Sequence, residues 1–280
     1  MPCPTFMPCP PCFAGLPGKV ISVRVLILGG TAQGRALAAE LRGRGNAHGR
    51  CQVVSSLAGR ISRPTLPEGE VRVGGFGGAE GLADYLRAES IDTLIDATHP
   101  FAQAISRHAA EAASTTGVRL IALRRPAWTA QPGDNWIHVP DIEAAAHEAA
   151  ILPNDACVFI TTGVRGLAFY ARDTRHPYLI RTVDPPPSTE ALPPRHTIVL
   201  DRGPYTLEGE ATLFNEHEIC ALVTKNSGGD QTAAKLTAAR QRGIPVIMVD
   251  PPAPPTGIET VGTVAQVVTL LGYDGQPRTP

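Results

Sequence analysis

One segment of this sequence combines the residue types that bind a dinucleotide diphosphate. Residues 29–34 read Gly-Gly-Thr-Ala-Gln-Gly, directly after the apolar run 23–28 and before a helical pattern. The amides of a glycine turn at a helix N-terminus, together with the helix dipole, favour an anionic group. The pattern departs from G-x-G-x-x-G because Thr31 stands at the third position, which adds a hydroxyl donor. The alternative is a purely structural turn. The expected cofactor-binding residues of this turn are Gly29, Gly30, Thr31 and Gly34.

The end of the next expected strand indicates which dinucleotide binds. A site that prefers NAD usually has an acidic residue there, which holds the ribose 2′-hydroxyl. No acid stands between Cys51 and Pro67, where the chain instead has Ser56 and Arg60. A hydroxyl and a guanidinium suit a 2′-phosphate, so these two residues favour NADPH over NADH. The alternative is a solvated basic loop.

A third segment, 96–102, reads Asp-Ala-Thr-His-Pro-Phe-Ala and follows the fourth expected strand. The carboxyl edge of a parallel sheet is where a nicotinamide could lie, so Thr98 is a candidate cofactor-binding residue. His99 is a candidate for proton transfer, because an unperturbed imidazole has a near-neutral pKa. The alternative is that His99 only caps the helix that Pro100 opens.

Hydroxyls, glycines and cations also follow the expected strands of the second half. Residues 223–229 read Val-Thr-Lys-Asn-Ser-Gly-Gly and form a second candidate anion-binding turn. Such a set of groups suits a substrate that carries several carboxylates. Each cation alone is as often a surface charge. The candidate substrate-binding residues are Arg124, Thr162, Arg181, Arg202, Lys225, Asn226 and Ser227.

Strand and helix patterns alternate along most of the chain, which is typical of an α/β protein with parallel sheets. The segment 125–140 interrupts the alternation with Pro, Gly and both tryptophans, so we expect the chain to cross to a second domain there. We predict two Rossmann-like parallel-sheet domains, 23–140 for NADPH and 141–272 for the substrate, with a cleft between them. The last expected helix, 264–271, falls in the second domain. The expected strands are 23–28, 52–55, 71–73, 93–97, 119–123, 157–161, 178–183, 197–200, 221–224 and 246–249.

Composition excludes other classes of protein. A net charge of −1, with 25 basic against 26 acidic residues, gives no strongly basic face for nucleic acid. No apolar stretch reaches the roughly 18 residues of a membrane span, and no secretory signal is evident, so we expect a cytoplasmic protein. The histidines lack metal spacing, and no metal is expected. Residues 1–22 are expected to form a disordered tail; the alternative is a translation start near Val20 or Val23.

Taken together and in order, these segments resemble the precorrin-6A reductase family of cobalamin biosynthesis over residues 23 to 272. Each segment alone is unspecific, and the ordered set is specific. The stretches that carry the resemblance are G-G-T-A-Q-G-R, S-S-L-A-G-R, G-G-F-G-G, D-A-T-H-P-F-A, R-R-P-A-W, T-T-G, R-G-P-Y, V-T-K-N-S-G-G and A-K-L-x-A-A-R.

The resemblance implies a two-domain oxidoreductase that acts on CH–CH groups and uses NADPH, bound in the cleft, to reduce precorrin-6A to precorrin-6B. The carboxylate arms of this tetrapyrrole match the cations of the second half, and transient contact with neighbouring pathway enzymes is also expected. His99, a bound water or a substrate carboxyl could supply the proton. The alternatives are a cobalt-precorrin-6A reductase of the anaerobic branch and a non-catalytic NADPH-binding regulator. An epimerase-like enzyme is disfavoured, since no tyrosine has a lysine four residues later.

Overall fold

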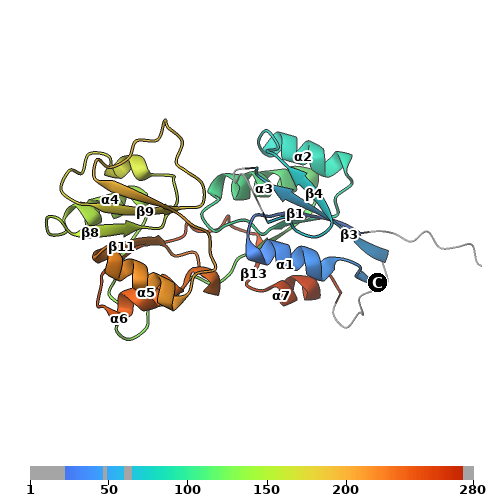
Figure 1. Ribbon diagram of the computed structural model, residues 1–280. Helices are drawn as coiled ribbons and strands as arrows, with labels where there is room; N and C mark the ends of the chain where they lie inside the picture. Colours follow the sequence, from blue (N-terminus) through green and yellow to red (C-terminus); the bar gives the residue numbers. More distant parts are fainter. Residues whose placement is uncertain (1–22, 47–48, 60–64, 274–280) are drawn as a thin grey trace, which may run out of the picture.

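The computed structural model describes residues 23–46, 49–59 and 65–273. The expected tail 1–22 and Arg60 lie outside these ranges. Two parallel sheets, each with helices on both faces, stand side by side along an elongated molecule (Figure 1). The predicted α/β class with two parallel-sheet domains is confirmed. No helix in the described ranges is long and apolar enough to cross a bilayer.

The first sheet has the strand order of a doubly wound dinucleotide-binding fold, which reverses direction between β1 and β5. Side chains alternate along β1, so Val25 and Ile27 pack on one face while Leu26 and Leu28 pack on the other. Because both faces are covered, residues 25–28 of β1 and 94–95 of β5 are apolar and buried. The parallel order is β4 (Glu70–Val73), β3 (Gly49–Leu57), β1 (Val23–Leu28), β5 (Thr93–Asp96), β6 (Arg119–Leu123) and β13 (Glu259–Val261), and β2 (Gly45–Asn46) pairs antiparallel with β3.

Four helices cover this sheet in two pairs. Helices α1 and α7 contact each other on the face of Val25, and α2 and α3 contact each other on the face of Leu26. Thr31 caps α1, and Thr263 caps α7 with a complete capping box. The bounds are α1 (Ala32–Leu41), α2 (Ala79–Ala88), α3 (Gln103–Thr116) and α7 (Val264–Leu270).

The second sheet is parallel throughout and reverses direction between β8 and β11. Helix α4 (Ile142–Ala150) and the short helix η1 (Leu167–Tyr170) cover one face. Helices α5 (Leu207–Glu216) and α6 (Ala234–Gln241) cover the other, and η2 (Asp230–Thr232) precedes α6. The order is β10 (His196–Leu200), β9 (Tyr178–Thr182), β8 (Cys157–Ile160), β11 (Ile219–Lys225), β12 (Val246–Val249) and β7 (Trp136–Val139).

The division of the chain between the sheets differs from the expected domains 23–140 and 141–272. Strand β7 pairs with β12, so the second domain begins before residue 140. Strand β13 pairs with β6, and α7 buries Val267 in the first core, so residues 259–272 belong to the first domain. Neither β7 nor β13 is among the strands expected from the sequence, and local periodicity does not say which sheet such a short strand joins. The chain therefore crosses twice between the domains, at 124–135 and at 250–258.

Candidate functional site

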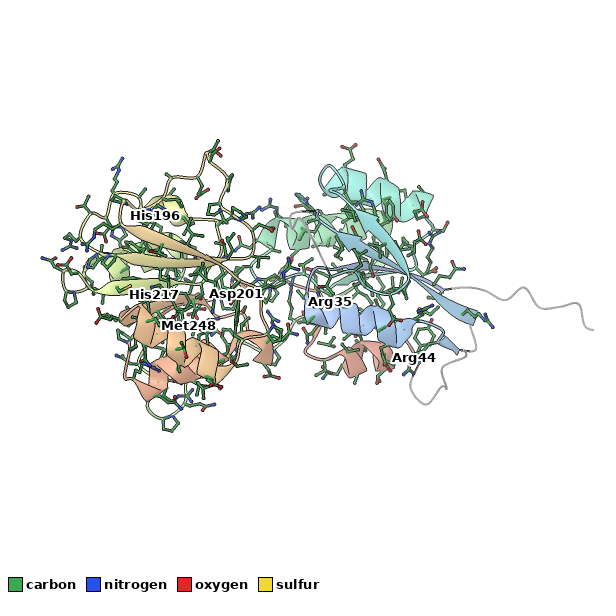
Figure 2. The ribbon with its side chains drawn as sticks, in the orientation of Figure 1. Arg35, Arg44, His196, Asp201, His217 and Met248 are labelled. Carbon is green, nitrogen blue, oxygen red and sulfur yellow. The ribbon has the colours of Figure 1, made fainter. Side chains whose placement is uncertain are left out.

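The carboxyl edges of the two sheets face each other across the middle of the molecule. Figure 2 shows Arg35, at the start of α1, and Asp201, directly after β10, on the facing sides of the two domains. His196, at the opposite end of β10, lies on the outer side. Each sheet also reverses its strand order, and in doubly wound folds ligands bind outside the carboxyl ends of the strands at such a point, so the two edges lie where the sequence predicts the ligand cleft.

The first glycine turn is preformed at the reversal of the first sheet. The amide of Gly29 donates to the carbonyl of Ser56 (2.9 Å), which ties the turn to β3. Gly30 has a φ of +112°, and the space where its Cβ would stand is open. A Cβ on Gly34 would lie 3.5 Å from Ala97, so this glycine allows α1 to pack closely. The space beside Gly30 is therefore open at the N-terminus of α1, a position that fits a diphosphate.

The hydroxyl of Thr31, expected as a donor near the phosphate, forms its hydrogen bonds within the protein. Its hydroxyl accepts the amide of Gly34 (3.0 Å) and donates to the carbonyl of Ala97 (2.8 Å). The hydroxyl proton is thus used inside the protein and not offered to a ligand. Thr31 connects the glycine turn to the loop after β5, and its side chain fixes the shape of the turn.

The ends of β3 and β4 form the other part of this edge. Ser56 is buried, and its hydroxyl accepts from Nη1 of Arg72 at 3.3 Å. The hydroxyl of the neighbouring Ser55 is buried and has no hydrogen-bond partner within the described ranges. Sequence reasoning missed Arg72. The available signal was its place two residues before the repeated glycines of 74–78 in a short parallel strand.

An ion pair holds the loop after β5. Asp96 accepts the amide and the hydroxyl of Thr98 (3.1 and 2.6 Å), and it pairs with Arg124, whose side chain is only 14% exposed. Arg124 also donates to the carbonyl of Thr98 (2.9 Å) and to Ser106 (2.6 Å). Arg124, expected to bind substrate, thus has three of its five donors engaged within the first domain, and it holds Thr98 through the Thr98 carbonyl.

His99 lies between the two domains as a neutral ring. Burial first, and then the charges of Arg125 and Lys225, lower the pKa of His99 from 6.5 to about 4. Nδ1 accepts the amide of Phe101 (3.3 Å), so the neutral ring carries its proton on Nε2. At neutral pH His99 can donate one hydrogen bond, while its charged acid form is scarce.

The loop after β5 also contacts the second domain. The ring of Phe101 packs against the core formed by α4 and β8, and Nζ of Lys225 lies 5.4 Å from that ring. Lys225 donates to the carbonyl of Thr162 (2.7 Å). Burial, together with the charge of Arg165, lowers the pKa of Lys225. The Thr162 hydroxyl is buried and has no partner in the described part of the chain.

The second glycine turn is covered by the chain itself. A Cβ on Gly228 would stand 2.0 Å from the carbonyl oxygen of Pro126, which belongs to the first crossing. Asn226 accepts the amide of Trp128 (2.7 Å) and donates to its carbonyl (3.2 Å), and Arg125 donates to the carbonyl of Ser227. Asn226 and Ser227, expected to bind substrate, therefore hold the crossing in the structure.

The two remaining candidate cations differ in exposure. Arg181 is 6% exposed, forms a buried ion pair with Glu210 (2.7 Å) and stacks 3.7 Å from the ring centroid of Tyr205. Arg202 is exposed, directly after Asp201 at the carboxyl edge of the second sheet. Arg181 is thus an interior residue, and Arg202 faces solvent at the edge that borders the cleft.

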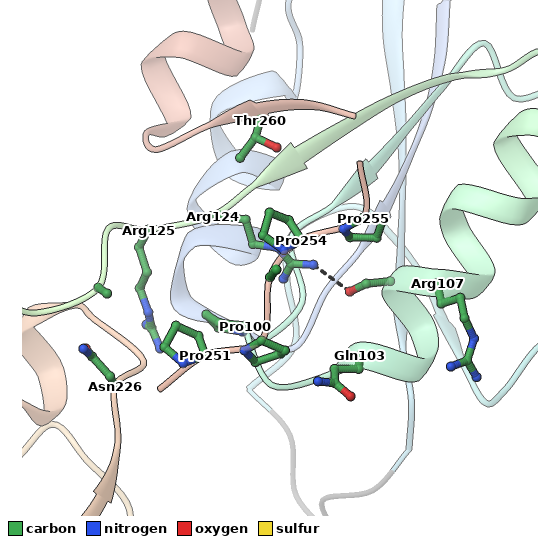
Figure 3. Close-up of a pocket in the computed structure, with 14 residues that line it drawn as sticks. Pro100, Gln103, Arg107, Arg124, Arg125, Asn226, Pro251, Pro254, Pro255 and Thr260 are labelled. Carbon is green, nitrogen blue, oxygen red and sulfur yellow. Dashed lines mark hydrogen bonds between the residues drawn. The ribbon is translucent and has the colours of Figure 1, made fainter. Parts of the chain in front are cut away.

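A pocket of about 420 Å³ lies where α3 meets the two crossings (Figure 3). The first turn of α3, with Pro100 before it, forms one wall, and Arg124 and Arg125 form another. The proline-rich return segment 251–255 closes the side between them. Several apolar walls with a few guanidinium groups are typical of a site for a ligand that is partly apolar and partly anionic.

Comparison with known proteins shows the family to which this chain belongs. The family described as precorrin-6x reductase CbiJ/CobK matches residues 24–272. The chain belongs to this family. Within it, a protein from Rhodococcus erythropolis named precorrin-6A reductase is 48% identical over 250 residues, covering 89% of this chain and 97% of that protein. One of the same name from Mycobacterium tuberculosis is 50% identical over 241 residues, covering 86% and 94%.

A solved structure supports the same assignment within the precorrin-6x reductase family. The structure of a CobK precorrin-6A reductase superposes with a TM-score of 0.81 at 41% identity and covers 91% of this chain and 98% of that chain. Proteins named cobalt-precorrin-6A reductase are more distant: the one from Priestia megaterium is 28% identical over 237 residues. The family and its two-domain fold are therefore shared along nearly the full length.

Proposed function

We propose that this protein reduces precorrin-6A to precorrin-6B with NADPH in cobalamin biosynthesis. The observation that carries the proposal is the match to the precorrin-6x reductase family over 24–272, combined with an open glycine turn at the reversal of the first sheet. The relatives at 48–50% identity are named precorrin-6A reductase, and the cobalt-precorrin-6A reductase from Priestia megaterium is 28% identical. The metal-free substrate is therefore favoured over the cobalt form.

The proposed cofactor contacts follow from the first domain. The amides at Gly30 and Thr31 face the diphosphate. Gly29, whose amide donates to the Ser56 carbonyl, and Gly34, which packs closely, shape the turn. Ser56 with Arg60 faces the 2′-phosphate. Thr98, which Asp96 and Arg124 hold, is the proposed contact for the nicotinamide end. The bound cofactor supplies the hydride.

The chain's own contribution to the reaction is position. The two carboxyl edges hold the cofactor and the macrocycle on opposite sides of one cleft, and fixing two reactants in register can supply roughly 7–11 kcal/mol of the barrier. Arg202 and Lys225, with Thr162 beside the latter, are the proposed contacts for carboxylate arms. Arg124, Arg181, Asn226 and Ser227 shape the cleft through their internal bonds.

His99 is proposed to hydrogen-bond rather than to supply the proton. Its pKa of about 4 leaves little imidazolium at neutral pH. The neutral ring can orient a water molecule or a substrate carboxyl through Nε2–H, and either of these groups can deliver the proton to the ring carbon. Of the three proton sources that the sequence left open, this proposal removes His99 and keeps the water molecule and the substrate carboxyl.

An anaerobic assay with fresh precorrin-6A tests the proposal. NADPH oxidation and the absorbance of the macrocycle are followed together. One mole of NADPH should be oxidised for each mole of macrocycle that is reduced. A non-catalytic regulator would bind NADPH tightly and leave the macrocycle spectrum unchanged. Faster turnover of the cobalt-containing macrocycle would show instead that the anaerobic branch is the correct assignment.

A further inference from the structure

Arg72 occupies the part of the first sheet where a ribose 2′ substituent belongs. Strands β3 and β4 are parallel, and Arg72 pairs in register with Ser56. Ser56 is also the residue whose carbonyl accepts the amide of Gly29 (2.9 Å), so one residue links Arg72 to the proposed diphosphate turn. In doubly wound folds the residue at the end of the second strand contacts the ribose 2′ position.

The guanidinium of Arg72 is held in place without a carboxylate. Nη1 donates to the carbonyl of Gly74 and Nη2 to that of Gly75, both at 2.7 Å. The group also lies 3.8 Å from the ring centroid of Phe76. Within the described ranges no acid pairs with Arg72. The nearby acids Glu70 and Glu89 both pair with Arg24 instead, and Arg72 keeps an unbalanced positive charge at this edge.

Two donors of Arg72 stay available in this arrangement. A guanidinium has five N–H groups. Among the residues that the structure describes, Nη1 uses two, on Gly74 and on Ser56, and Nη2 uses one on Gly75, so Nε–H and one Nη2–H have no partner there. Nε and Nη2 share the edge of the guanidinium that binds a phosphate through two parallel hydrogen bonds. The group is thus both oriented and incompletely used.

We infer that Arg72 determines the preference for a 2′-phosphorylated dinucleotide, with its Nε–Nη2 edge and the Ser56 hydroxyl on the 2′-phosphate. The inference rests on the proposed function, since it needs a pyridine dinucleotide in the first domain. It adds a specificity residue to Arg60, and it gives a role to the carbonyls of Gly74 and Gly75, which orient the guanidinium. If the role of Arg72 were purely structural, it would bond these carbonyls and make no contact with the cofactor.

Calorimetric titration of the full chain tests the inference with NADPH, NADH, 2′,5′-ADP and 5′-ADP. For Arg72→Gln we expect the affinity for NADPH and 2′,5′-ADP to fall about ten- to hundred-fold, because a charge-assisted pair to the phosphate is lost. NADH and 5′-ADP should bind within two-fold of wild type. Arg72→Lys keeps the charge and should recover part of the loss. The control is Arg87→Gln, an exposed arginine of α2 that bonds Asp84.

The possible outcomes of this titration are distinguishable. Equal weakening of phosphorylated and unphosphorylated ligands would overturn the inference and assign Arg72 to the loop alone, and so would unchanged affinity for all four. If Arg72→Gln does not fold, Arg72→Lys and Ser56→Ala should still weaken 2′,5′-ADP selectively, and equal binding by these variants would overturn it. Wild-type protein that binds neither dinucleotide would instead refute the proposed function.

Discussion

The reversal points of the two sheets have similar sequences and different surroundings. Each has a buried strand followed by a glycine turn, at 29–34 after β1 and at 226–229 after β11. The first turn is open above Gly30, while the second lies against Pro126 of the crossing chain. Glycine in a turn shows that something approaches closely or that φ is positive. It does not show whether a ligand or the chain itself approaches.

The largest expected effect concerns the buried ion pair between Glu210 and Arg181 in the second domain. Glu210→Gln leaves Arg181 without its partner in the interior, so the free energy of unfolding should fall by about 3–5 kcal/mol. Urea denaturation followed by tryptophan fluorescence measures it, because Trp128 and Trp136 both pack on this core. Glu259→Gln is the control: its pair with Arg119 is over 40% exposed and should contribute less than about 1 kcal/mol. Equal effects would contradict the larger contribution expected of the buried pair.

A smaller effect is expected where the chain covers the second turn. Gly228→Ala places a methyl group 2.0 Å from the Pro126 oxygen, so the crossing must shift, at a cost of about 2–4 kcal/mol. Gly163→Ala is the matched control, with a φ of +81° in the same domain and no atom near its Cβ. Its cost should be the backbone strain alone, about 1–2 kcal/mol. Similar denaturation midpoints for the two variants would show that the turn is not covered.

The first turn should respond in binding rather than in stability. Gly30→Ala meets no protein atom, so its stability loss should match that of Gly163→Ala. Its methyl group stands in the space proposed for the diphosphate, and NADPH affinity should fall about ten-fold or more as charge-assisted bonds to the amides are lost. Titration of both variants checks this, and Gly163→Ala should bind NADPH as wild type does. Normal NADPH binding by Gly30→Ala would remove the difference between the two turns.

The smallest expected effect is the response of the reaction to pH. His99 has a pKa lowered to about 4, so its titration should be absent from the rate between about pH 6 and pH 8. Because the folded state binds its proton less readily than the unfolded state, its stability contribution is complete above about pH 6.5 and is lost as pH falls toward 4. The free energies of unfolding of wild type and His99→Gln, measured over this pH window, should converge at low pH. A rate that titrates near 6.5 and loses this step in His99→Gln would contradict the neutral ring.

Much of the fold follows from local patterns in the sequence. The apolar runs of β1 and β5 and the glycines between β1 and α1 identify the doubly wound edge, because parallel strands and their turns are encoded locally. The exchange of β7 and β13 between the domains is not encoded this way. These strands have four and three residues, and their pairing depends on distant partners.

The site was less predictable than the fold for the same reason. Arg124 and Arg181 look like surface cations in sequence, and only the fold brings Asp96 and Glu210 to them. Arg72 becomes visible only once the register of β3 and β4 places it opposite Ser56. The chemistry of these side chains is set by contacts between residues that lie 16 to 29 positions apart.

Hydrogen–deuterium exchange of the full chain with and without NADPH tests the contrast between the two turns most directly. We predict slower exchange on NADPH binding in peptides that contain residues 29–34 and 55–59, with no change in peptides that contain 226–229. Protection at 226–229 without protection at 29–34 would contradict the account.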